Sequence, residues 1–119
     1  MHFLAAGLRS VTYALAGIQY LVRTQHNAWL HAVSTVVVLS AGVALRVSSR
    51  DWCWLIAAIA AVWVAEAINT AVELLADAAC PDHHPLIGRA KDVAAGAVLM
   101  ASMGAVSVGL FVLVPHFVV

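Results

Sequence analysis

The chain has 119 residues, of which 64% are hydrophobic and only 10% are charged, whereas soluble globular proteins carry about 25% charged residues. This length allows one domain, and this composition excludes a soluble globule and indicates an integral membrane protein. The formal net charge is zero, so the sequence makes no electrostatic case for a nucleic-acid partner.

Residues 1–27 predict an amphipathic helix, because apolar residues recur at spacings of three and four while polar residues fall between them. The segment is neither long nor apolar enough to cross a bilayer. We expect it to lie along the membrane surface, with Tyr13 and Tyr20 at the depth of the lipid headgroups.

Three apolar segments follow, and we predict that each is a transmembrane helix: residues 28–45, 52–76 and 93–114. The predicted fold is therefore an all-α membrane protein, with one surface helix and three spans in a single domain over residues 1–119. A short turn joins the first two spans, a loop with two prolines joins the last two, and residues 115–119 form a short tail.

The basic residues indicate how the chain is oriented in the membrane. Three spans place the N-terminal segment and the second loop on one side, together with Arg9, Arg23, Arg89 and Lys91. The other side carries fewer basic residues, so the positive-inside rule makes the first side cytoplasmic.

Polar residues interrupt the second span at helical spacing. Glu66, Thr70, Glu73 and Asp77 share one narrow face, with Asn69 beside it. Glu66 lies about 21 Å of helix from Trp52, which is still within or at the edge of a hydrocarbon layer of about 30 Å. A carboxylate at that depth is costly and indicates a functional site by default.

The charged groups near the cytoplasmic surface suit phosphoryl transfer, because carboxylates can hold Mg²⁺, a lysine can bind phosphate, and a deeper carboxylate can act as a base. The residues alone leave two interpretations open. One is a membrane enzyme that uses a nucleotide or a metal, and the other is a polar face that packs three helices or lines an ion path.

Two stretches resemble a known family. They are Glu66-Ala-Ile-Asn69-Thr-Ala-Val-Glu73 with Asp77 four residues on, and Ala90-Lys91-Asp92-Val-Ala-Ala-Gly; His84-Pro-Leu and residues 23–31 add to the match. They are similar to the bacterial diacylglycerol kinase and undecaprenol kinase family, small lipid kinases of the bacterial cytoplasmic (inner) membrane. The resemblance implies a homotrimer with composite sites between subunits, open to the cytoplasm. It also implies ATP, Mg²⁺ and a membrane lipid alcohol as substrate, cofactor and acceptor.

The resemblance also implies roles for individual residues. Glu66 resembles the catalytic base toward the lipid hydroxyl, Asn69 the active-site asparagine, and Glu73 the carboxylate that binds metal and ATP. Lys91 and Asp92 are similar to the pair that engages the nucleotide, with Lys91 on the phosphates. The remaining nucleotide contacts that the resemblance implies are Asp82, His83, His84 and Tyr13.

One position departs from the family pattern: Gln25 stands where well-known members have a second metal-binding glutamate. An amide oxygen can ligate Mg²⁺ but carries no charge, so we expect weaker metal affinity, or, as the alternative, a non-catalytic relative with a degraded metal site. The details around Asn69 and Lys91 are closer to the undecaprenol kinase branch than to the diacylglycerol kinases. We expect His31 and Ser34 to hydrogen-bond within the helix bundle, and Asp77 to be a solvated charge or a helper residue.

Overall fold

The computed structural model describes residues 1–118, and all their regular secondary structure is helical. Four long helices and one short helix follow in order: α1 (His2–Thr24), α2 (His26–Ala44), α3 (Ser49–Ala79), α4 (Pro85–Leu113) and α5 (Pro115–Val118). The predicted C-terminal tail is helical as far as Val118, and its last residue, Val119, lies outside the described residues.

The boundary between α1 and α2 lies at Gln25, whose backbone is extended (φ −92°, ψ 124°). The predicted surface helix therefore ends at Thr24 and not at residue 27, and α2 begins at His26, earlier than the predicted span. A single extended residue is enough to redirect the chain, because it interrupts the ladder of backbone hydrogen bonds that would otherwise continue.

The starts of α3 and α4 are fixed by local caps. Arg46 takes a left-handed backbone conformation (φ 53°) in the turn after α2, and Ser48 then caps α3 by accepting a hydrogen bond from the Asp51 amide at 3.1 Å. Pro85 occupies the first turn of α4, where its missing amide hydrogen has no cost. His84 caps this helix, because its Nδ1 accepts a hydrogen bond from the Leu86 amide at 3.1 Å.

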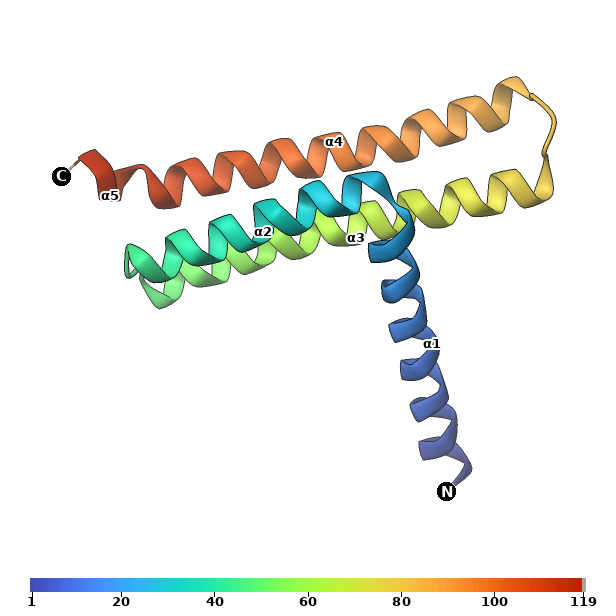
Figure 1. Ribbon diagram of the computed structural model, residues 1–119, viewed down its shortest axis with the longest axis horizontal. Helices are drawn as coiled ribbons and strands as arrows, with labels where there is room; N and C mark the ends of the chain where they lie inside the picture. Colours follow the sequence, from blue (N-terminus) through green and yellow to red (C-terminus); the bar gives the residue numbers. More distant parts are fainter. Residues whose placement is uncertain (119) are drawn as a thin grey trace.

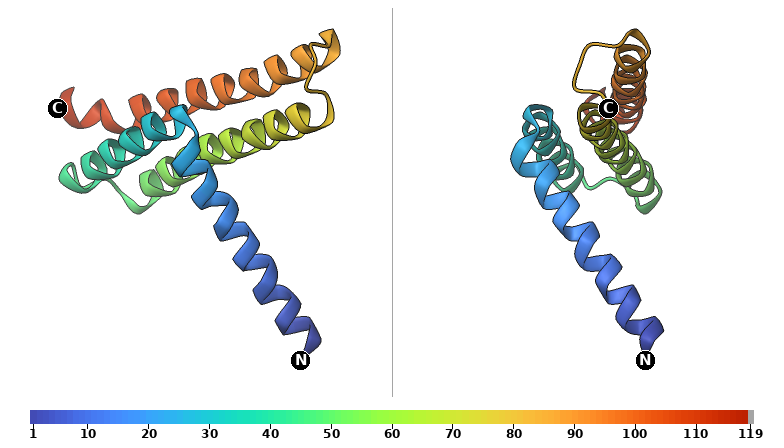
Figure 2. Two further views of the ribbon diagram at one scale, coloured as in Figure 1. Left: turned by 45° about the vertical axis from the view of Figure 1, so that its right-hand side comes forward. Right: turned by 90° about the vertical axis from the view of Figure 1, so that its right-hand side faces the viewer.

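Helices α2, α3 and α4 form an antiparallel bundle, and α1 leaves it at a steep angle near the end that carries the α3–α4 loop (Figure 1, Figure 2). Within residues 1–118, three segments are long and apolar enough to cross a membrane: His26–Ala44, Ser49–Ala79 and Pro85–Val118. With 31 residues, α3 is about 46 Å long and exceeds a hydrocarbon layer of about 30 Å. Its C-terminal end therefore extends beyond the apolar layer.

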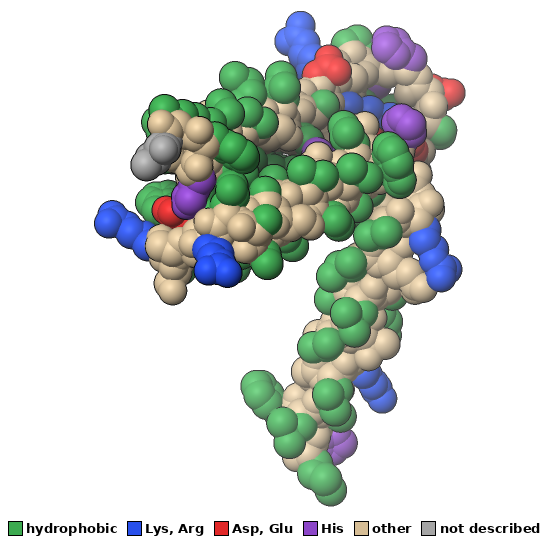
Figure 3. All heavy atoms as spheres, turned by 60° about the vertical axis from the view of Figure 1, so that its left-hand side comes forward, with side chains coloured by type: hydrophobic (Ala, Val, Ile, Leu, Met, Phe, Trp, Pro, Cys, Tyr) green, Lys and Arg blue, Asp and Glu red, His purple; other side chains and the backbone are tan. Residues whose placement is uncertain are grey.

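The surface of the bundle is largely apolar. Charged side chains gather at its two ends, with hydrophobic side chains between them (Figure 3). Large exposed hydrophobic residues occur on every long helix, among them Phe111 and Val36. A soluble monomer rarely exposes apolar surface on this scale, whereas a lipid-facing or subunit-facing helix requires it.

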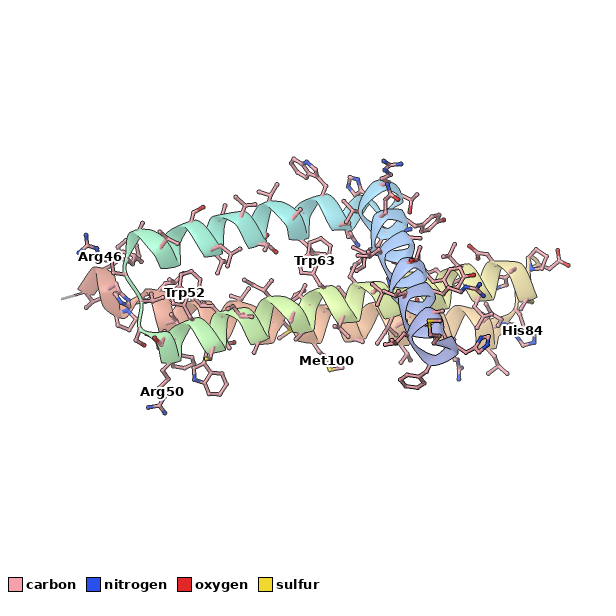
Figure 4. The ribbon with its side chains drawn as sticks, turned by 90° about the horizontal axis from the view of Figure 1, so that it is seen from below. Arg46, Arg50, Trp52, Trp63, His84 and Met100 are labelled. Atoms are coloured by element: carbon pink, nitrogen blue, oxygen red, sulfur yellow. The ribbon has the colours of Figure 1, made fainter. Side chains whose placement is uncertain are left out.

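At the end of the bundle away from α1, the helices approach closely. Val47, Leu55 and Val112 are buried together there, and Trp52 packs against them. A Cβ atom at Gly42 would lie only 2.7 Å from Cη2 of Trp52, so the absence of a side chain on α2 lets the indole ring lie between α2 and α3 (Figure 4).

Candidate active site

The polar face predicted on the second span is present on α3, and its burial changes along the helix. Glu66, Asn69 and Thr70 are only 1%, 6% and 4% exposed, Glu73 is half-buried, and Asp77 is exposed. The face therefore joins a closed apolar end to an open aqueous end over about three turns of helix.

The most buried carboxylate, Glu66, faces an imidazole on α2. Its Oε2 atom lies 3.3 Å from Nε2 of His31. Neither atom has an aligned hydrogen-bond partner among the described residues, so the two groups are in contact but both keep hydrogen-bonding capacity. The expected hydrogen bond of His31 within the bundle is replaced by this contact. Ser34 is exposed and donates to the carbonyl oxygen of Leu30 on its own helix.

A second contact between the same two helices lies one turn away. The indole Nε1 of Trp63 on α3 donates a hydrogen bond to Oγ1 of Thr35 on α2 at 3.0 Å, and the Trp63 side chain extends from α3 toward α2 (Figure 4). The Trp63 ring also meets the His31 ring edge to face, with centroids 6.1 Å apart. Two adjacent polar contacts thus fix the register of α2 against α3.

Amide and hydroxyl groups follow Glu66 toward the surface. Asn69 donates from Nδ2 to Oε1 of Glu73 at 3.5 Å, a long hydrogen bond. Its own Oδ1, and Oγ1 of Thr70, are buried without a hydrogen-bond partner in the part of the chain that the structure describes. Buried polar atoms of this kind are usually paired, so these oxygens are available to a ligand or to water.

The side-chain oxygen atoms around Glu73 can be compared with the set of ligands that Mg²⁺ requires. Mg²⁺ usually keeps several waters and binds one or two carboxylates together with substrate phosphates. Within residues 1–118, no three His, Cys, Asp or Glu side chains gather as a metal site. The register set by His31 and Trp63, extended by about two turns, brings Gln25 level with Glu73. These residues fit a cation shared between one carboxylate, amide oxygens and a nucleotide, and not a site made by protein alone.

Lys91 at the start of α4 pairs with Asp77 near the end of α3, with Nζ 2.5 Å from Oδ1. Asp77 is therefore not merely a solvated charge, because it pairs with the lysine for which the family resemblance implies phosphate binding. The pair is largely exposed, so water screens it and a stronger anion can compete for the lysine.

The remaining predicted residues do not gather around Glu73 in a single chain. Asp82, His83 and His84 lie on the exposed loop between α3 and α4, where His84 caps α4, and Asp92 is exposed on the first turns of that helix. Tyr13 is exposed on α1, which leaves the bundle in another direction (Figure 2).

A cavity of about 350 Å³ lies between α2, α3 and α4. His31, Ser34, Thr35 and Ser102 contribute polar groups to its lining, while Leu55, Leu113 and Phe117 are among its apolar residues. In the helix register that the Lys91–Asp77 contact marks, Ser102 on α4 lies level with Glu66 on α3. The polar residues of the cavity therefore lie at the depth of the buried carboxylate.

Four residues near the site had no predicted role in it: His31, Thr35, Trp63 and Ser102. A signal for the first was available: in an antiparallel pair joined by a turn near residue 48, residues equally distant from the turn face each other. His31 and Glu66 are such a pair. The geometry of the pair could not be read from the sequence, because side-chain direction depends on how each helix is rotated.

Comparison with known proteins identifies relatives over nearly the whole chain. Residues 12–113 match the family described as prokaryotic diacylglycerol kinase. The chain is 34% identical over 107 residues to an undecaprenol kinase of Bacillus subtilis (strain 168), covering 90% of this chain and 87% of that one. It is 38% identical over 109 residues to a diacylglycerol kinase of Synechocystis sp., covering 91% of this chain and 62% of that longer one. A diacylglycerol kinase of Escherichia coli (strain K12) is 34% identical over 86 residues, which are 64% of this chain and 70% of that one.

Proposed function

Because the chain belongs to the prokaryotic diacylglycerol kinase family and is therefore a lipid kinase, we propose that it transfers the γ-phosphoryl group of ATP to the hydroxyl of a membrane lipid. The two candidate acceptors are undecaprenol, which would give undecaprenyl phosphate, and diacylglycerol, which would give phosphatidic acid. The observation that carries this proposal is the change in burial along α3, from Glu66 at 1% exposure to Asp77 in water.

In the proposed reaction, the lipid oxygen forms a bond to the γ-phosphorus while the bond to the bridging oxygen of ADP breaks. The hydroxyl proton passes to the carboxylate of Glu66, and the electron pair of the broken bond leaves with ADP. Burial of Glu66 supports this role, because a base that is excluded from water takes its proton from the lipid and not from solvent. Asn69, one turn along the face, would orient the transferred phosphoryl group, because its Nδ2 carries a second hydrogen besides the one that it donates to Glu73.

The water-facing end of the site would hold the nucleotide. Glu73 would bind Mg²⁺ together with the ATP phosphates, helped by the amide of Gln25, and when bound this ion neutralises phosphate charge. Lys91 would exchange Asp77 for a phosphate oxygen, which its exposed position allows. Asp92, Asp82, His83, His84 and Tyr13 complete the proposed nucleotide contacts.

We further propose a homotrimer in the bacterial cytoplasmic membrane, with the site open to the cytoplasm. The separation of Tyr13 and the loop residues from Glu73 within one chain supports sites shared between subunits, as do the exposed apolar helix faces. The positive-inside rule supports the orientation, because Arg23, Arg89 and Lys91 flank the end of the bundle that carries Glu73.

Undecaprenol is the acceptor we favour. The relative named undecaprenol kinase aligns over most of both chains, and the local sequence around Asn69 and Lys91 is closer to that branch. The higher identity to a diacylglycerol kinase keeps diacylglycerol as the second candidate.

A lipid panel with labelled ATP tests both levels of the proposal. Purified protein in mixed micelles is given undecaprenol, diacylglycerol or no lipid, with Mg²⁺ and with EDTA. We expect labelled undecaprenyl phosphate as the main product, and none with EDTA. Preference for diacylglycerol would change the substrate alone. Absence of any phosphorylated lipid, together with absence of nucleotide binding, would support the non-catalytic alternative that Gln25 raises.

A further inference from the structure

The contact between His31 and Glu66 is isolated from other polar groups. Both atoms of the contact are buried, and neither has another hydrogen-bond partner among the residues described. A carboxylate with one neighbour of this kind has few ways to fix its orientation. The imidazole is therefore the polar side chain that is in position to orient the Oε2 side of Glu66.

One neighbouring side chain, the indole of Trp63, contacts the imidazole ring, and Thr35 links that indole to the backbone of α2. Thr35 donates to the backbone carbonyl of His31 at 2.7 Å and accepts from Trp63 at 3.0 Å. The edge-to-face contact of Trp63 then limits rotation of the His31 ring. Because Trp63 lies one turn before Glu66 on α3, the helix that carries the carboxylate also supports the ring that faces it.

We propose that His31 is a positioning residue for Glu66, on the premise that Glu66 is the base of the proposed function. In the tautomer with its proton on Nε2, a small rotation of the ring would turn the 3.3 Å contact into a hydrogen bond to Oε2 of Glu66 and leave Oε1 free for the lipid hydroxyl. His31 also lines the cavity between α2, α3 and α4, so it stands between the apolar space and the carboxylate. Displacement of a reacting group by about 1 Å can lower the reaction rate by about 100-fold.

The test compares three variants of the full-length protein in the lipid-phosphorylation assay. His31→Leu removes the hydrogen-bond donor and puts an apolar side chain of similar size in its place, whereas His31→Gln keeps an N–H donor. Ser40→Ala is the matched control, because Ser40 lies on the same helix, is exposed and does not line the cavity. Turnover, KM for ATP, KM for the lipid and the Kd for ATP are measured for each.

We expect His31→Leu to lower kcat by about 10- to 100-fold, with KM and Kd for ATP within about twofold of the wild type. His31→Gln should have a kcat at least about fivefold higher than that of His31→Leu, which a purely structural effect of losing the ring would not produce. Ser40→Ala should have the kcat of the wild type. An active wild type with an equally active His31→Leu would overturn the positioning role and leave the proposed function in place. Wild-type inactivity with every lipid would overturn the proposed function and this inference together.

If His31→Leu does not fold, His31→Asn decides the question, because its shorter amide cannot reach Glu66 from the same backbone position. We expect a fall in kcat of at least about 10-fold with unchanged ATP binding. An unchanged kcat in the folded His31→Asn protein would overturn the inference.

Discussion

Gly42→Ala tests whether close approach of α2 and α3 sets the register of the bundle. The added methyl group would lie 2.7, 3.0 and 3.2 Å from three carbons of the Trp52 ring, closer than packed carbon atoms approach each other. The ring is rigid and packs against the buried cluster of Val47, Leu55 and Val112, so it cannot rotate away without losing that packing. Either the ring or α2 must move.

The expected loss of stability follows from two opposing effects. Overpacking of this kind costs about 1–3 kcal/mol, whereas alanine in place of glycine within a helix gains about 0.5–1 kcal/mol. We therefore expect a net destabilisation of up to about 2 kcal/mol, and lower kinase activity, because any shift of α2 also moves His31 relative to Glu66.

Denaturant unfolding of the purified protein in micelles, followed by far-ultraviolet circular dichroism, measures this change. Gly104→Ala on α4 is the matched control, since a Cβ atom there meets nothing within 4 Å, and it should be as stable as the wild type or more so. Adding Trp52→Leu to Gly42→Ala should remove most of the steric penalty. Equal stability of Gly42→Ala and Gly104→Ala would refute the reasoning.

Three further predictions concern the site. Glu66→Gln should lower turnover by about 10²- to 10⁴-fold while assembly and ATP binding, measured by gel filtration and calorimetry, stay intact; normal turnover would remove Glu66 as the base. Gln25→Glu should lower the Mg²⁺ concentration for half-maximal activity, because it adds a second carboxylate level with Glu73, and an unchanged Mg²⁺ titration would contradict that placement. Lys91→Met should raise KM for ATP by at least about 10-fold, whereas Asp77→Asn should change it by less than about threefold, since the pair is exposed; equal effects of the two changes would show that the ion pair and not the lysine matters.

The arrangement of helices could be predicted from the sequence because hydrophobic periodicity and length determine it. The apolar runs, the turn near residue 48 and the prolines at 81 and 85 predict the order of α2, α3 and α4, although α3 and α4 begin earlier than the predicted spans. The exact residue at which α1 ends could not be predicted, because the hydrophobic pattern does not indicate that the backbone of Gln25 is extended.

The candidate site, like the fold, has features that could be predicted from the sequence and features that could not. The polar face of α3 follows from helical spacing alone, and the structure agrees with it in burial from Glu66 to Asp77. Partners on other helices were harder to predict: the contacts of His31 with Glu66 and of Asp77 with Lys91 depend on the rotation of each helix and on the register between them. The roles of Tyr13 and the α3–α4 loop stay predictions, because a single chain does not bring them to Glu73.

The burial of Glu66 also determines how the base is restored after each turnover. In the proposed reaction every cycle leaves one proton on a carboxylate that is 1% exposed, and that proton has to reach water before the next lipid can react. The lipid enters as a neutral alcohol and departs into the bilayer as an anion, and we expect its departure to open the space beside Glu66 to water. We therefore expect proton release to be coupled to product release, so that a solvent isotope effect on steady-state turnover would report on the opening of the site as well as on the chemical step.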